Sequence, residues 1–96
     1  MTKKALPGMK IKISDDVLKG SYANTLVVTH TSEEFVLDFI LSLPPQGVIN
    51  SRIITSPRHL KRFIEALRQN LARYEERQGP VSVAPDPAGR RPGEVH

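Results

Sequence analysis

The sequence predicts an α+β fold, in which an antiparallel β-meander of about four strands is followed by one long C-terminal α-helix. Residues 10–55 contain short runs rich in β-branched and aromatic side chains, separated by turn-forming residues, which is typical of antiparallel strands. Residues 57–78 instead repeat apolar side chains with a helical period. The middle strands are apolar on both sides, and this predicts that two copies of the chain pack together as a homodimer.

The 96 residues divide into three segments by composition. Residues 1–9 form a short flexible lead, residues 10–79 the single folded unit, and residues 80–96 a tail rich in proline and glycine. The tail has too few apolar side chains to offset the entropy that ordering would cost, so it is expected to be flexible. The first twenty residues lack the apolar run of a signal peptide, and no run is long enough to span a bilayer, so no membrane partner is expected.

Four strands are expected in order along the folded unit. Lysine and isoleucine alternate over residues 10–13, which predicts a short edge strand with its lysines outward. Turn-forming residues follow at 14–16 and 19–21, and the next strands are expected at residues 22–30, 35–41 and 48–55. The turns between the last three, at residues 31–34 and 44–47, are short enough to favour a meander.

One long helix is expected to follow the last strand. Ser56 is a typical N-cap, and Pro57 suits the first helical position because its missing N–H would have no partner there. Gly79 and Pro80 end the helix. One side of this helix carries its apolar side chains: Leu60, Phe63, Ile64, Leu67, Leu71 and Tyr74.

The strands that are apolar on both sides predict how the chain assembles. Val36, Asp38 and Ile40 are expected on one side of their strand, opposite the side with Phe35, Leu37, Phe39 and Leu41. In the following strand, Ile49 and Ile53 are expected on one side and Val48, Arg52 and Ile54 on the other. The helix is expected to cover one side of the sheet and a second copy the other, either by packing sheet against sheet or by exchanging helices. The expected dimer contacts are Val36, Ile40, Val48 and Ile54.

Asp38 is the one charged residue among those apolar positions. It is expected to pair with Arg52 if the register places the two opposite one another, and this interpretation is favoured over a catalytic role.

The net charge of +4 is concentrated in the helix, where six basic and three acidic residues lie between positions 57 and 79. Arg58, Lys61 and Arg62 crowd its first turns, where the helix dipole is already positive, so local stability does not explain their placement. With Arg52 they are candidate contacts for an anion: single-stranded nucleic acid, an acidic protein, or Glu33 and Glu34 of a neighbouring subunit. A solvated face without a partner is the alternative. Few aromatic residues are free to stack on bases, which weighs against nucleic acid.

No catalytic, cofactor-binding or metal-binding motif is present. The chain has no cysteine, its three histidines are scattered, and it lacks the glycine-rich loops that bind nucleotides. Ser56 is close to His59, but a capping role explains it more simply than a nucleophilic one. The sequence therefore predicts a small non-enzymatic interaction module that needs no cofactor; the alternative is a single-stranded nucleic-acid-binding protein that uses the basic start of the helix.

Four stretches resemble a known family: GSYAN at 20–24, HTSEEFVLDF at 30–39, SRIITSPRHLKR at 51–62 and NLARYEERQG at 70–79. Over residues 10–79 the chain resembles the prokaryotic domain of unknown function family 3467, which implies a small cytoplasmic protein and supplies no catalytic residues. The last strand and helix are also similar to the end of a PUR-type repeat. That likeness implies a meander and a helix that pair through exchanged helices and bind single-stranded nucleic acid, although the exposed aromatics of PUR-type strands are missing here.

Overall fold

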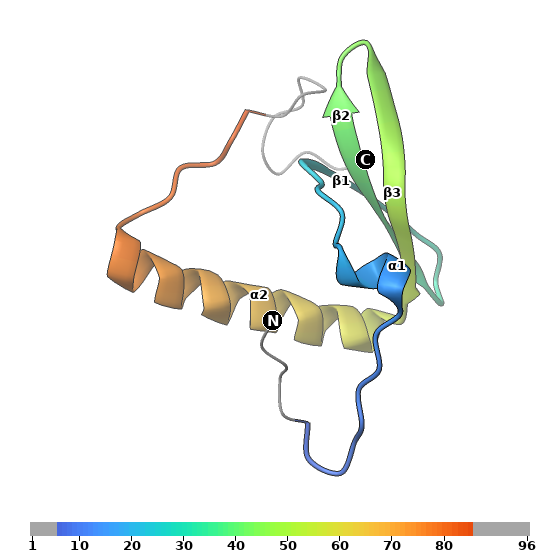
Figure 1. Ribbon diagram of the computed structural model, residues 1–96, viewed down its shortest axis with the longest axis vertical. Helices are drawn as coiled ribbons and strands as arrows, with labels where there is room; N and C mark the ends of the chain where they lie inside the picture. Colours follow the sequence, from blue (N-terminus) through green and yellow to red (C-terminus); the bar gives the residue numbers. More distant parts are fainter. Residues whose placement is uncertain (1–5, 86–96) are drawn as a thin grey trace.

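The computed structural model describes residues 6–85 and contains a three-stranded antiparallel sheet followed by a long helix (Figure 1). This confirms the α+β class and the order of the elements. Strands β1, β2 and β3 lie in sequence order across the sheet, so the meander is also confirmed. The elements are α1 (Asp15–Leu18), β1 (Thr25–His30), β2 (Phe35–Leu43), β3 (Gln46–Thr55) and α2 (Pro57–Gln78).

The described residues form three strands, and the expected edge strand at residues 10–13 is not among them. Those residues have no regular secondary structure, and Ile11 and Ile13 are about half exposed. The backbone carbonyl of Ser14 accepts hydrogen bonds from the N–H groups of Val17 and Leu18, which starts the short helix α1. A run of four alternating residues makes a strand only where a sheet edge accepts it, and here the chain turns into α1 instead.

Strand β1 begins at Thr25, three residues later than expected, because Asn24 ends the ladder with its side chain. The Asn24 side-chain amide donates to the backbone carbonyl of Ser42 and accepts from the Ser42 N–H, at 3.0 and 2.9 Å. It thereby takes the place that a further strand residue would occupy. The residues before Asn24 are free to leave the sheet edge and run toward α1.

Both expected turns are present. The Thr31 hydroxyl accepts from the backbone N–H groups of Glu33 and Glu34, both at 3.2 Å, and closes the turn between β1 and β2. Pro44 and Pro45, joined by a cis peptide bond, connect β2 to β3. Strands β2 and β3 extend to this turn and are therefore longer than expected.

Strand β3 has one extra residue, Asn50, which forms a β-bulge and shifts the pairing register between β2 and β3. Phe39 pairs with Ser51 but Ile40 pairs with Ile49, so Asn50 has no partner in β2. Such a bulge reverses the side on which all residues before it point.

The register defines two sheet faces, because directly paired residues point to the same side. We name them by their content. The aromatic face carries Leu26, Val28, His30, Phe35, Leu37, Phe39, Leu41, Val48 and Ile53, and the ion-pair face carries Val27, Val36, Asp38, Ile40, Ile49, Arg52 and Ile54.

Helix α2 begins and ends where the sequence predicts. The Ser56 hydroxyl accepts from the His59 N–H at 3.2 Å, Pro57 occupies the first turn, and the Gly79 N–H donates to the Glu75 carbonyl. Gly79 has a φ of 92°, a left-handed conformation that favours glycine. Val81 then donates its backbone N–H to the Glu75 carboxylate, so the described start of the predicted tail is held at the helix end. Residues 86–96 of that tail, and residues 1–5 of the predicted lead, lie outside the described range.

The helix covers neither face of its own sheet, contrary to the expectation that it would cover one. Among the described elements, only β1 with β2 and β2 with β3 contact each other over several residues. Helix α2 runs away from one end of the sheet (Figure 1). The reason is the link: Ser56 alone separates β3 from α2, whereas a helix that folds back onto a sheet needs a loop of about 2–6 residues. Leu37 and Asp38 are consequently the only buried residues in residues 6–85.

The capping bond predicts the effect of Ser56→Ala. Loss of the only side-chain acceptor at the first turn should lower the free energy of unfolding by about 1 kcal/mol, measured by urea denaturation at fixed protein concentration. Ser14→Ala is the matched control, since Ser14 also precedes a helix but its side chain makes no capping bond. Equal effects of the two substitutions would contradict this role of Ser56.

Candidate functional site

The largest unusual feature of the chain is an exposed apolar stripe on α2. We call this the helix stripe and define it as Leu60, Phe63, Ile64, Leu67, Leu71 and Tyr74. Leu60 is half-buried and the others are exposed, with Leu67, in the middle, 71% exposed. Monomeric proteins rarely leave a contiguous patch of this kind in water, so the stripe is a candidate interaction surface.

The aromatic face is a second uncovered apolar surface. Leu26, Val48 and Ile53 are exposed on it, while Phe35 and Phe39 are half-buried. The rings of His30 and Phe35, which pair across β1 and β2, lie 4.9 Å apart and cover part of this face at one end. None of the residues that define this face carries an acidic or permanently cationic side chain.

The ion-pair face brings together three of the four expected dimer-contact residues. Val36, Ile40 and Ile54 all lie on it, and Ile54 is 57% exposed. Val48 lies on the aromatic face instead, and Ile49 takes its place beside Ile40, because the bulge at Asn50 reverses the first part of β3. An asparagine within an apolar strand was the sequence signal for this bulge.

Asp38 and Arg52 pair directly across β2 and β3, as expected. Arg52 donates from Nε to Oδ1 of Asp38 at 2.6 Å and from an Nη to Oδ2 at 3.0 Å. These hydrogen bonds, with the positive charge of Arg52, hold the pKa of Asp38 below its ordinary value, and the carboxylate in turn raises the pKa of Arg52. The pair provides hydrogen bonds to the buried Asp38 carboxylate. Because Arg52 already binds Asp38, it is only partly available to an outside anion.

The other three candidate anion contacts lie together on α2. Arg58, Lys61 and Arg62 are exposed, and none forms an ion pair with another residue of the described range. At about 100° per residue, Arg58 and Arg62 lie on the side of the helix opposite the stripe, and Lys61 lies on its flank. They therefore stay accessible when the stripe is covered.

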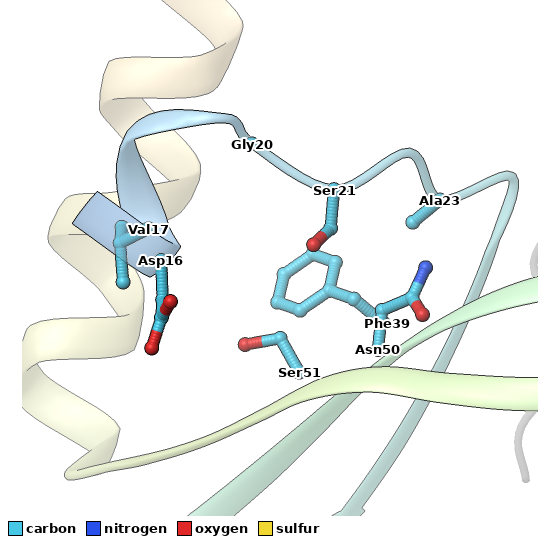
Figure 2. A pocket seen from close by; sticks show the side chains of 8 residues that line it. All are labelled: Asp16, Val17, Gly20, Ser21, Ala23, Phe39, Asn50 and Ser51. Carbon is cyan, nitrogen blue, oxygen red and sulfur yellow. The ribbon is translucent and has the colours of Figure 1, made fainter. Parts of the chain in front are cut away.

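A hollow on the aromatic face, which the sequence analysis did not anticipate, lies between β3 and the segment around α1. It has a volume of about 450 Å³ and is lined by Asp16, Val17, Gly20, Ser21, Ala23, Phe39, Asn50 and Ser51. Figure 2 shows the Phe39 ring between Ser51 and the chain from Gly20 to Ala23. The Asn50 amide donates to the Tyr22 carbonyl at 2.6 Å and ties this segment to the bulge.

The lining of the hollow offers one carboxylate, Asp16, two hydroxyls and an amide, and no basic side chain. Asp16 is the one candidate general base among these residues, and no hydrogen bond joins its carboxylate to Ser21 or Ser51. Within residues 6–85, no three acidic or histidine side chains come close enough to hold a metal ion, and no helix there is long and apolar enough to cross a membrane.

A family model described as protein of unknown function (DUF3467) matches residues 1–83. The chain belongs to the DUF3467 family. This confirms the resemblance drawn from the sequence motifs and extends it beyond residues 10–79. No curated protein and no solved structure is significantly similar to this DUF3467 chain.

The Asp38–Arg52 pair predicts a pH-dependent stability. Because the folded pKa of Asp38 is lowered, its contribution is present above the unfolded value of about 4 and is lost as the pH falls through the folded pKa. Asp38→Asn should therefore lower the unfolding midpoint at pH 7, and the difference from the parent protein should shrink at pH 3, as measured by thermal denaturation. Asp15→Asn, at an exposed position, is the control, and a difference of the same size at both pH values would contradict the assignment.

Proposed function

We propose that this DUF3467 chain is a non-enzymatic interaction module that works as a homodimer. The observation that carries the proposal is the helix stripe, which is exposed along α2 and out of reach of its own sheet. A chain in which only Leu37 and Asp38 are buried within the described range lacks the core that a domain of this size needs. A second copy supplies the missing cover.

The magnitudes favour association. Full burial of a Leu, Ile or Phe side chain contributes about 1.5–3 kcal/mol, so six side chains that are about half exposed contribute roughly 5–9 kcal/mol per helix. The burial free energy of two helices and of the sheet surface that they cover together exceeds the cost of association. That cost, in lost translational and rotational freedom, is roughly 4–15 kcal/mol. A dimer is therefore stable on these terms, and a lone chain is not.

Within residues 6–85 no group of reactive side chains converges, and this supports the non-enzymatic part of the proposal. The Asp38 carboxylate is held by Arg52, and in the hollow beside Phe39 the one carboxylate, Asp16, forms no hydrogen bond with either serine. General acid–base or nucleophilic chemistry needs such groups within hydrogen-bond reach of one another.

Leu67→Glu tests the dimer. We expect the parent protein to sediment as a dimer at low micromolar concentration, and the variant to dissociate at least about tenfold more readily, because a charge then lies in the middle of the buried stripe. Analytical ultracentrifugation over a concentration series measures both.

Gln69→Glu is the matched control for this experiment. It places the same new carboxylate two residues away on the opposite side of the helix, where the only contact it changes is the exposed hydrogen bond from Gln69 to Glu65 of the same helix. A parent protein with the mass of one chain, or equal dissociation of the two variants, would count against the proposal.

A second candidate function rests on the basic start of α2. Arg58, Lys61 and Arg62 are all exposed, with the two arginines opposite the stripe and Lys61 on its flank, so a dimer would present two such groups to an anionic partner. Single-stranded nucleic acid, whose phosphates carry repeated negative charges, is the alternative partner named from the sequence.

Titration of a labelled single-stranded oligonucleotide at two salt concentrations tests this candidate. Binding should weaken as salt rises and should be lost in the variant Arg58→Glu/Arg62→Glu, because both changes remove phosphate contacts. Arg73→Glu/Arg77→Glu makes the same charge change near the other end of the helix and serves as the control. Salt-independent binding, or none at micromolar protein, would remove the candidate.

A further inference from the structure

We infer that the two copies exchange helices, so that α2 of each copy lies lengthwise on the aromatic face of the other. The inference rests on the proposed dimer and names the surface that is covered: the partner of the helix stripe is the aromatic face of a second copy of this chain. The ion-pair face then points outward on both sides of the dimer.

The direction of α2 supports this arrangement. Asp16 and Val17 of α1 line the hollow that contains Phe39, so α1 lies on the aromatic side of the sheet. In Figure 1, α2 leaves the end of β3 toward the same side as α1 and forms an open angle with the sheet. A helix that enters this angle from a two-fold related copy meets the aromatic face, and the first copy's helix meets the partner's in return.

The two surfaces match in size. From Leu60 to Tyr74 the stripe is about 21 Å long at 1.5 Å per residue. From Phe35 to Leu41 the aromatic face is about 20 Å long at roughly 3.3 Å per residue. Three strands place the outer two about 10 Å apart, which is close to the diameter of one helix.

The area is also what a stable dimer needs. At about 25 cal/mol per Å², a fully buried apolar side chain corresponds to roughly 60–120 Å². Six half-exposed stripe residues and a similar set on the aromatic face then give about 400–700 Å² of apolar surface per copy. Since about two thirds of a homodimer interface is apolar, this corresponds to roughly 600–1,100 Å² per copy, close to the standard value of about 800 Å².

The ion-pair face is the poorer partner for the stripe. The Arg52 side chain is 59% exposed, and only two of its five N–H donors are used by Asp38. Leucine and phenylalanine side chains laid over it would remove the remaining donors from water without an acceptor. The aromatic face carries no such charge, and the hollow beside Phe39 leaves room for stripe side chains such as Leu67.

Cross-linking between singly substituted chains tests the inference. The chain has no cysteine, so an introduced one is the only thiol. Leu67→Cys is refolded in a mixture with Ile53→Cys or, separately, with Ile54→Cys, and treated with a short bismaleimide. Ile53 and Ile54 are neighbours in β3 with 44% and 57% exposure, but they lie on the aromatic and the ion-pair face respectively. We expect a mixed product between positions 67 and 53, identified by peptide mass, and its loss with position 54.

A second measurement does not depend on cross-linking chemistry. Ile53→Glu should raise the dimer dissociation constant at least about tenfold, whereas Ile54→Glu should leave it nearly unchanged. A dimer in which position 67 couples to position 54, or only to position 67 of the other copy, overturns the inference but leaves the proposed dimer standing. A parent chain that stays monomeric in the ultracentrifuge overturns both.

Discussion

The length of the connection between β3 and α2 is the constraint on which this structure depends. Ser56 alone joins them, and it already serves as the helix cap, so the helix continues outward from the end of the strand. A longer loop would allow the stripe to fold back over its own sheet and would produce an ordinary two-layer monomer. With one residue, the helix makes no extended contact with the sheet of its own chain, and the stripe stays exposed within the chain.

The bulge at Asn50 and the ion pair at Asp38 divide the sheet into two unlike sides. The bulge moves Val48 onto the aromatic face and Ile49 onto the ion-pair face, and its side chain holds the segment before β1 through Tyr22. The Arg52 guanidinium keeps the opposite face partly polar although most of its other side chains are apolar. The two faces of the sheet therefore differ in charge, since only the ion-pair face carries the Asp38–Arg52 pair.

Much of the fold follows from local patterns in the sequence. The helix bounds, the turns at Thr31 and Pro44, and the Asp38–Arg52 pair were predicted because each depends on neighbouring residues or on one hairpin register. The strand at residues 10–13, the side of Val48 and the position of the helix were wrong because each depends on longer-range geometry. A sheet edge must accept a strand, a single extra residue reverses every side chain before it, and a one-residue link prevents packing that amphipathicity alone allows.

Folding and association are one process in the proposed dimer. Helix α2 is locally stabilised by the Ser56 cap and by the Glu65–Arg68 pair, but Arg58 and Lys61 oppose the dipole at its start. In the proposed dimer its stability comes mostly from the surface that its stripe covers, so the stability of the chain is expected to depend on its concentration. The same two-fold symmetry duplicates the basic helix starts and the ion-pair faces. A partner that contacts one copy weakly can contact both, so the dimer gains binding strength without any further contact built into the single chain.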